Sequence, residues 1–343
     1  MTTIAFFNNK GGVGKTSVVY HLAWMYADMG TSVVAADLDP QANLTSMFLD
    51  EREMEELLEP DPPRQTIHGS LVPLLRGTGD IDAPAARVLA PAISLIPGDL
   101  ALSQAEDDFS SQWPLCLDKN ERAFRVITAL SRILEQAKID AEAKLVLIDV
   151  GPNLGAINRA ALIASDFIAV PLSPDLFSLQ GLRNLGPALR NWQTGWKDRA
   201  EISRRLDGLS DLKVPMGAMT PIGYMVLQHA VRLDRPVRAY ARWMDAIPGE
   251  YCKSILGEDS ARERTIDADN NCLGRLKHYR SLMAYAQDAR KPMFKLTSAD
   301  GAIGGHINAV RDCYRDFRAL ADELLQRCVG AEQDTLTDSR TGC

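Results

Sequence analysis

A glycine-rich segment close to the start of the sequence has the residue types that bind phosphate groups. It consists of Lys10, Gly11, Gly12, Val13, Gly14, Lys15, Thr16 and Ser17. Glycine lets backbone N–H groups approach a phosphate closely, and the N-terminus of a following helix adds partial positive charge. We expect Lys15 to reach the β- and γ-phosphates and the Thr16 hydroxyl to bind Mg²⁺. The segment therefore predicts a nucleoside triphosphate site.

Three carboxylates follow short apolar runs elsewhere in the chain. Asp37 and Asp39 come after the run at residues 32–36, and Asp149 comes after the run at residues 145–148. In open parallel sheets, ligands bind beyond the carboxyl ends of the strands. We therefore expect these carboxylates and the glycine-rich segment at one edge of the sheet.

The elements that must position these residues alternate along the chain. Apolar runs predict strands at residues 3–7, 32–36, 145–148, 167–170 and 222–227. Residues 18–26 have helical spacing of their apolar side chains, and Gly30 is placed to end that helix. Strands that alternate with helices predict an α/β fold, a mostly parallel twisted sheet with helices on both faces.

Other segments do not show such patterns. Residues 50–65 are acidic and proline-rich, which predicts an exposed excursion, and residues 77–92 are rich in Gly, Asp, Ala and Pro. Residues 331–343 lack apolar periodicity, so we expect a flexible tail there. We expect residues 1–330 to form a single domain with long insertions near 50–92 and 199–270.

The composition limits the class of protein. Of 343 residues, 46% are hydrophobic, which excludes a disordered chain, and no apolar run has the roughly 18–20 residues of a membrane span. The first ten residues do not resemble a secretory signal. The six cysteines are widely scattered, so neither a disulfide scaffold nor a zinc site is indicated. These features predict a cytoplasmic location.

Several motifs together resemble the ParA/MinD family of ATPases, and within it the ParA/Soj partition type. Asn9 stands where an ordinary phosphate loop has its first glycine, and Lys10 adds a second lysine, which is the family's deviant loop. The sequence D-L-D-P-Q-A-N at 37–43 and the strand L-V-L-I-D at 145–149 also resemble family segments. Further similarity lies at 95–103, 170–181 and 291–302, so the resemblance extends over roughly residues 3–325.

The resemblance implies a P-loop NTPase fold and slow, partner-stimulated hydrolysis of ATP with Mg²⁺. It assigns catalytic roles to Lys10, Lys15 and Asp39, with Asp39 orienting the attacking water and Lys10 reaching the nucleotide of a second copy in an ATP-dependent homodimer. Asp149 would hold a metal-bound water, and Asp37 would support the metal's outer shell. Asp39 and Thr16 complete the expected metal site. One departure is the sequence after Asp149, V-G-P instead of the family's C-P-P or T-P-P, which bears on the timing of hydrolysis.

ParA-type proteins bind DNA non-specifically as ATP dimers, which requires exposed basic residues. Residues 199–295 contain 17 Lys/Arg and 12 Asp/Glu, a net charge of +5 in a chain of net charge −7. Two groups are candidates for DNA contact: Arg232, Arg235, Arg238 and Arg242, and then Arg275, Lys277 and Arg280. Solvated helix faces with acidic partners are the alternative interpretation. For the base of the nucleotide, the candidates are Pro174 and Gln228, and Gln228 has an equal claim to be a surface polar residue.

The resemblance also implies partners and a place in the cell. A ParB-like protein would stimulate hydrolysis, and the protein would be cytoplasmic and nucleoid-associated while it segregates or positions a plasmid, chromosome or other cargo.

A MinD-like positioning ATPase is the alternative, but residues 330–343 lack the basic amphipathic pattern of a membrane anchor. An iron–sulfur carrier would need clustered cysteines near Asp149. An ATP-dependent ligase on the same fold would need a small-acid pocket beside the γ-phosphate.

Overall fold

A computed structural model describes residues 2–59, 65–83, 86–227, 237–258, 265–302 and 304–341. Within these residues, one sheet has the strand order β3-β4-β2-β5-β1-β6-β7-β8. All neighbouring strands are parallel except β3 and β4, which are antiparallel. The predicted α/β fold with a mostly parallel sheet is confirmed. The strands are β1 (Thr2–Phe6), β2 (Val33–Leu38), β3 (Arg87–Ala90), β4 (Ile93–Ile96), β5 (Leu145–Val150), β6 (Phe167–Leu172), β7 (Thr220–Leu227) and β8 (Cys272–Leu276).

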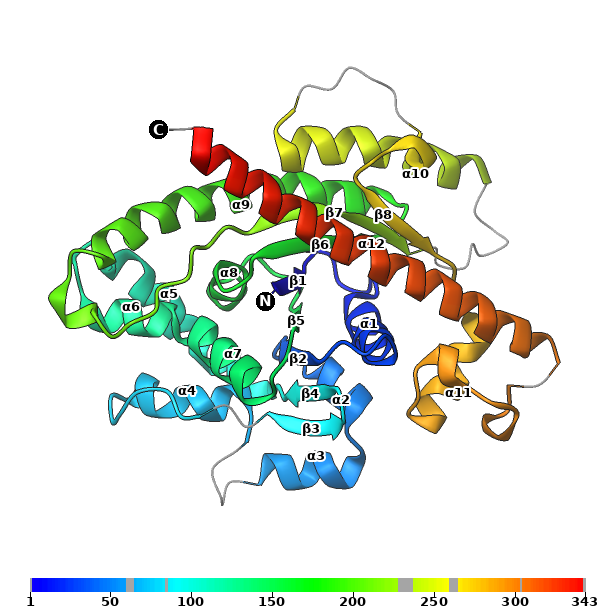
Figure 1. Cartoon of the computed structure of the whole chain (residues 1–343), viewed down its shortest axis with the longest axis horizontal. Coiled ribbons are helices and arrows are strands. Elements are labelled where there is room, and N and C mark those ends of the chain that lie inside the picture. The colour runs from blue at the N-terminus through cyan, green and yellow to red at the C-terminus, as the bar shows by residue number, and fades with distance from the viewer. Residues whose placement is uncertain are drawn as a thin grey trace.

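Helices cover both faces of the sheet, as Figure 1 shows. One apolar core joins the sheet to α1, α11 and α12, and the other joins it to α4–α9 and α10. None of the helices in the described part of the chain is long and apolar enough to cross a membrane. The α-helices are α1 (Lys15–Asp28), α2 (Asn43–Phe48), α3 (Glu51–Leu58), α4 (Ile67–Arg76), α5 (Glu106–Leu115), α6 (Glu121–Ile127), α7 (Ala129–Asp140), α8 (Ala156–Ile163), α9 (Leu176–Ser203), α10 (Val237–Tyr251), α11 (Arg280–Ala289) and α12 (Gly305–Thr341).

The register of the central strands brings the candidate site residues together. Phe6, the last residue of β1, pairs with Asp149 of β5, and Asp37 of β2 pairs with Asp149 from the other side. All six residues of β2 and of β5 are buried, because helices cover both faces of these parallel strands. The phosphate loop and the three carboxylates therefore share one edge of the sheet.

Three segments differ from the sequence expectations. The acidic excursion contains helix α3, which begins with a capping box in which Asp50 and Glu53 each accept a hydrogen bond from the other's backbone N–H. The segment 77–92, in which we expected no regular structure, contains β3. Helix α12 continues to Thr341 through the expected tail. The flexibility of residues 331–343 stays a prediction.

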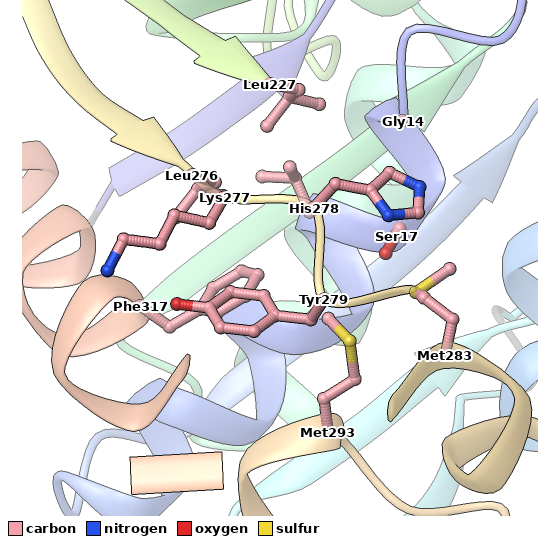
Figure 2. A pocket seen from close by; sticks show the side chains of 11 residues that line it. Gly14, Ser17, Leu227, Leu276, Lys277, His278, Tyr279, Met283, Met293 and Phe317 are labelled. Atoms are coloured by element: carbon pink, nitrogen blue, oxygen red, sulfur yellow. The ribbon is translucent and has the colours of Figure 1, made fainter. Parts of the chain in front are cut away.

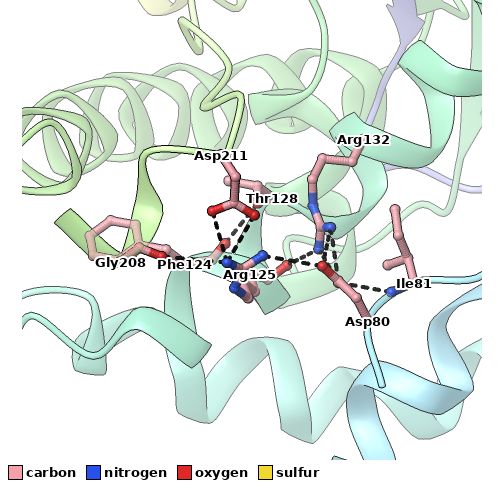
Figure 3. A network of polar contacts seen from close by, with 8 residues as sticks. All are labelled: Asp80, Ile81, Phe124, Arg125, Thr128, Arg132, Gly208 and Asp211. Atoms are coloured by element: carbon pink, nitrogen blue, oxygen red, sulfur yellow. Dashed lines mark hydrogen bonds and ion pairs between the residues drawn. The ribbon is translucent and has the colours of Figure 1, made fainter. Parts of the chain in front are cut away.

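An ion-pair network attaches the first insertion to the helices beside it (Figure 3). Asp80, which follows α4, accepts hydrogen bonds of 2.9 Å from both terminal nitrogens of Arg132 on α7. Arg125 of α6 contacts Asp80 at 3.2 Å and Asp211 at 3.0 Å. Because two arginines share Asp80 and one of them also pairs with Asp211, the network connects segments that are far apart in sequence. Networked ion pairs of this kind hold surface segments better than isolated pairs do.

A buried histidine connects α1 to the segment before α12, and it makes stability depend on pH. His21 Nδ1 donates to the Ser17 carbonyl oxygen at 2.6 Å, and His21 Nε2 accepts from the Met293 N–H at 3.1 Å. Both contacts are satisfied only by the neutral ring, and burial lowers the pKa of His21 to about 4. The neutral ring's contribution to stability is therefore complete above pH 6.5 and is lost as the pH falls toward 4.

We expect the free energy of unfolding to decrease by about 3 kcal/mol between pH 7 and pH 4 through His21 alone. Denaturant titrations at several pH values would measure this loss in the wild type and in His21→Gln, which cannot titrate. The variant should lack this part of the pH dependence, whatever its stability at pH 7. Parallel pH profiles for the two proteins would contradict the assignment.

Candidate nucleotide-binding site

The phosphate loop connects β1 to α1 in a conformation that requires glycine. Gly12 and Gly14 have φ values of 71° and 87°, in the left-handed region, and Gly14 is the N-cap of α1. A Cβ on Gly14 would also lie 2.7 Å from Leu227. Asn8 fixes the start of the loop, because its side chain accepts from the Lys10 N–H at 3.0 Å and donates to the Pro171 carbonyl at 2.7 Å. The backbone of the loop thus has a conformation that suits a phosphate.

Lys15 and Asp149 lie together beneath this loop. Lys15 Nζ is buried and donates to the Asn8 carbonyl at 3.3 Å. Burial lowers the pKa of Lys15, and the nearby carboxylates of Asp149 and Asp39 partly oppose this shift. A buried lysine at this position can place its charge on a phosphate without competition from water.

Asp149 has the character of a metal ligand. It is fully buried, and among the described residues neither of its carboxylate oxygens accepts a hydrogen bond of ordinary geometry. Burial and the neighbouring Asp37 raise the pKa of Asp149 well above its usual value, while the Thr16 hydroxyl opposes the shift. Mg²⁺ at a phosphate site needs only one or two carboxylates besides the phosphate oxygens. Asp149 and Thr16 therefore fit a Mg²⁺ site.

Asp37 is held by the protein itself. Its Oδ2 accepts from both the N–H and the hydroxyl of Thr45, at 2.8 and 2.7 Å, and the Thr45 hydroxyl oxygen accepts from the Gly98 N–H at 2.9 Å. Burial raises the pKa of Asp37. One of its oxygens is thus saturated by α2, which fits the outer-shell role better than direct ligation. Both roles stay predictions.

Asp39 and Lys10 are the remaining predicted catalytic residues. Asp39 is buried, and its Oδ1 accepts from the Gln41 N–H at 3.0 Å, which leaves the second oxygen for a water. Lys10 lies at the exposed side of the loop and forms an ion pair with Asp175, whose other oxygen caps α9 through the Ser178 N–H. The Lys10 ammonium group thus contacts a residue of its own chain.

An apolar cavity of about 110 Å³ opens beside the loop (Figure 2). Gly14 and Ser17 form one side of it, and Leu227 at the end of β7 forms another. The remaining wall comes from Val18 of α1, from the end of β8 and from the segments that follow it: Leu276, Lys277, His278, Tyr279, Met283, Met293 and Phe317. Its place next to Ser17 suits the base and ribose of a nucleotide.

Sequence analysis missed this wall because it missed β8. The signal was the apolar pair Leu273 and Leu276 ahead of a His-Tyr sequence, which is too short to identify a strand by periodicity. Pro174, which we expected beside the base, is buried and is not among the residues that line the cavity, whereas Gln228 lies outside the described residues. Contact of either residue with the base stays a prediction.

The two groups of predicted DNA-contact residues lie on different segments of the chain. Arg232 and Arg235 lie outside the described residues, Arg238 is on α10, and Arg242 is an exposed residue of α10. In the second group, Arg275 pairs with Asp267 at 2.6 Å and Lys277 with Asp312 at 3.9 Å, while Arg280 begins α11.

Comparisons with known proteins agree with this geometry. A sequence model of the family described as "AAA domain" matches residues 1–202, more than half of the chain. The chain belongs to the ParA/MinD family of ATPases. This ParA/MinD-family protein is 28% identical over 202 residues to the chromosome partitioning protein ParA of Caulobacter vibrioides, a match that covers 59% of this chain and 67% of that one.

Two further curated relatives have related names. The sporulation initiation inhibitor protein Soj of Bacillus subtilis is 29% identical over 233 residues, which cover 68% of this ParA/MinD-family chain and 79% of Soj. A putative replication protein A of Rhizobium rhizogenes is 30% identical over 186 residues, 53% of this chain. The match spans only 42% of that relative's own length.

Solved structures with the same fold cover nearly the whole ParA/MinD-family chain. Protein DIP2308 of Corynebacterium diphtheriae is 23% identical with a TM-score of 0.68, over 96% of this chain and 99% of that one. A putative plasmid partition protein of Borrelia burgdorferi, bound to AMPPNP, is 16% identical with a TM-score of 0.59, over 95% and 99% of the two chains. At these identities the structures show the fold alone.

Proposed function

We propose that this ParA-type protein is a Mg²⁺-ATP-dependent switch that hydrolyses ATP slowly, dimerises when ATP is bound and then binds DNA non-specifically. The observation that carries the proposal is the pair of lysines on one phosphate loop. Lys15 is buried under the loop beside Asp149, whereas Lys10 lies at its outer side. In this proposal Lys15 serves the chain's own nucleotide, and Lys10 leaves Asp175 to reach the nucleotide of a second copy.

The chain's own residues would divide the chemistry between them. The loop N–H groups and Lys15 hold the phosphates, Asp39 orients the attacking water, and the cavity beside Ser17 encloses the nucleoside. Mg²⁺, held by Thr16 and Asp149, would neutralise charge on the β- and γ-phosphates. Lys10 from the second copy would supply positive charge to the transition state, as an arginine finger does in trans.

Exposed apolar side chains support a dimer at this edge. Phe177 and Leu176 begin α9, next to the Lys10–Asp175 pair, and their exposures are 70% and 49%. Leu100 after β4 and Leu154 after β5 are also exposed, and they follow the two strands that flank β2, at the same edge of the sheet. A face of apolar side chains around a charged site is typical of an interface between proteins.

We expect Phe177→Ser to weaken ATP-dependent dimerisation by about 10-fold or more, because an interface loses a large aromatic anchor. Sedimentation with ATP would measure the dimer, and equilibrium binding would measure nucleotide affinity, which should change little. Ile139→Ser is the control, since Ile139 is 56% exposed at the end of α7, near the amino end of β5. Equal dimerisation of both variants and the wild type would contradict this interface.

The basic surface for DNA extends beyond the predicted second group. Asp312 of α12 contacts both Lys277 and Arg315, and Arg311 and Arg315 line one hollow of this helix. Lys277, Arg311 and Arg315 are three cations beside one acidic residue, Asp312. Exposed ion pairs contribute little to stability, so phosphates can replace Asp312 as partner. Arg311 and Arg315 have no basic run around them in sequence, which is why sequence analysis missed them.

The experiment that tests the proposal is binding to random-sequence duplex DNA without nucleotide, with ADP and with ATP, at two salt concentrations. We expect binding only with ATP, a steep loss with salt, and no binding by Lys10→Ala. Lys277→Glu combined with Arg315→Glu should remove DNA binding and keep the ATP dimer, whereas Arg52→Glu on α3 should change neither. An ATP dimer of the wild type that binds no DNA would contradict this function.

The cellular task follows from these properties. A DNA-bound ATP dimer that a ParB-like protein releases by stimulating hydrolysis would segregate or position a plasmid, chromosome or other cargo over the nucleoid. The name of the chromosome partitioning protein ParA among the curated relatives supports this task.

A further inference from the structure

Two sets of contacts hold the loop that follows Asp149. The first is Asn158 of α8, whose side chain is almost fully buried. Its Nδ2 donates to the Gly151 carbonyl at 2.8 Å and to the Asn153 carbonyl at 2.7 Å, and it lies 3.0 Å from Asn153 Oδ1. Asn153 Oδ1 also accepts from the Gly155 N–H at 2.9 Å. One amide group thus connects the beginning and the middle of the loop to the helix that follows.

The second contact comes from a different element. Glu106, the first residue of α5, accepts hydrogen bonds from the first two backbone N–H groups of α8: Oε1 from Ala156 at 2.5 Å and Oε2 from Ile157 at 3.1 Å. A carboxylate is stabilised at a helix N-terminus by these N–H groups and by the helix dipole. A Cβ on Gly155 would lie 2.6 Å from Glu106 Oε1, so glycine leaves the room for this contact.

The held loop lies against the residue expected to orient the attacking water. A Cβ on Gly151 would be 3.3 Å from Asp39 Oδ1 and 3.6 Å from Asn158 Nδ2. The position where a side chain at residue 151 would begin therefore faces both the Asp39 carboxylate and the Asn158 amide. Any movement of the loop changes the space next to the Asp39 carboxylate.

Glycine at 151 leaves the loop backbone with more freedom than a proline there would allow. The hydrogen bonds of Glu106 and Asn158 restrict it instead. We propose that Glu106 and Asn158 are positioning residues for ATP hydrolysis, which hold the loop at residues 151–155 against Asp39 so that its carboxylate can orient the water. This inference rests on the proposed ATPase function and adds two residues that act through Asp39.

The test is the separation of turnover from binding in Glu106→Gln. Glutamine offers one acceptor in place of two, and its NH₂ group would face the N–H of Ala156 or Ile157. We expect kcat for ATP, measured with random-sequence duplex DNA, to fall about 10-fold or more, with the Kd for ATP within about 2-fold of the wild type. Asp107→Asn, an exposed carboxylate in the same turn of α5, is the matched control and should leave both values unchanged.

Two further measurements separate this role from a general loss of structure. Glu106→Asp keeps the carboxylate and should restore part of kcat, and Asn158→Ala should reproduce the kcat defect if Glu106→Gln does not fold. Hydrogen exchange should show faster exchange of the Ala156 and Ile157 amides in Glu106→Gln, with the rest of the sheet protected.

Three results would contradict this inference, and each leads to a different conclusion. Unchanged kcat in both Glu106→Gln and Asn158→Ala would overturn the inference and leave the ATPase function in place. A loss of ATP affinity equal to the loss of kcat would also overturn it, because the two residues would then support the whole site. A wild type that binds ATP but shows no turnover would overturn the proposed function together with this inference.

Discussion

Replacement of Lys15 by methionine is expected to lower the affinity for ATP by about 100-fold or more. The side chain is buried, so water cannot solvate its ammonium group as it does at the surface. This loss of solvation lowers the pKa of Lys15. A charge-assisted hydrogen bond to phosphate in such a place contributes about 2–3 kcal/mol, which corresponds to this loss. Methionine keeps the length of the side chain and removes only its charge and its donors.

Equilibrium binding of a fluorescent ATP analogue would measure the effect. Lys144→Met is the control, because Lys144 is exposed just before β5, at the opposite edge of the sheet, and this variant should bind like the wild type. Nucleotide affinity within about 3-fold of the wild type in Lys15→Met would contradict the placement of the phosphates on this loop.

Replacement of Asp149 by asparagine is expected to have two opposite effects. Without nucleotide, the variant should be more stable than the wild type at pH 8, because a buried carboxylate that lacks ordinary hydrogen bonds from the described residues is costly when ionised. With ATP, the variant should lose the dependence of nucleotide affinity on Mg²⁺, because Asp149 is the carboxylate that we expect to hold a water bound to the metal. A group that lowers stability and is needed for a ligand is typical of a functional site.

The effect of Asp149→Asn on stability depends on pH, and its sign follows from the pKa of Asp149. The pKa of Asp149 is raised in the folded protein, so its contribution to stability is complete below the unfolded value of about 4 and is lost as the pH rises. The stability difference between Asp149→Asn and the wild type should therefore grow from pH 5 to pH 8 in denaturant titrations without nucleotide. A variant less stable than the wild type at pH 8, or one whose ATP affinity still depends on Mg²⁺, would count against the assignment.

The sequence predicted the central part of the fold well and the edges poorly. The expected strands at 3–7, 32–36, 145–148, 167–170 and 222–227 correspond to β1, β2, β5, β6 and β7 within a few residues, because buried parallel strands are continuous apolar runs. We missed β3 and β8, which are the two edge strands of the sheet, together with β4. Edge strands are short and only partly buried, so their composition resembles that of loops. Long-range pairing, and not local pattern, decides that they are strands.

The candidate site was likewise predictable from the sequence only in part. The glycine spacing, Lys15 and the carboxylates at 37, 39 and 149 were identifiable from sequence, because phosphate binding requires particular residue types at a fixed spacing on one short segment. The cavity wall after β8 could not be predicted, since its residues come from segments about 260–300 positions away from the loop. The pairing of Lys10 with Asp175 was equally invisible, because it depends on β1 and β6 lying side by side.

The sequence by itself therefore determined the chemistry at the phosphate loop and the order of strands and helices that supports it. Both are local: a glycine that must have positive φ and an apolar run that must be buried are recognisable without knowing their neighbours. The tertiary structure alone decided which polar groups are paired. Thr45 saturates one oxygen of Asp37, Asp149 keeps both of its oxygens free of ordinary hydrogen bonds among the described residues, and Glu106 holds α8. Such pairings depend on the packing of distant elements, and they give three similar aspartates and one glutamate different surroundings.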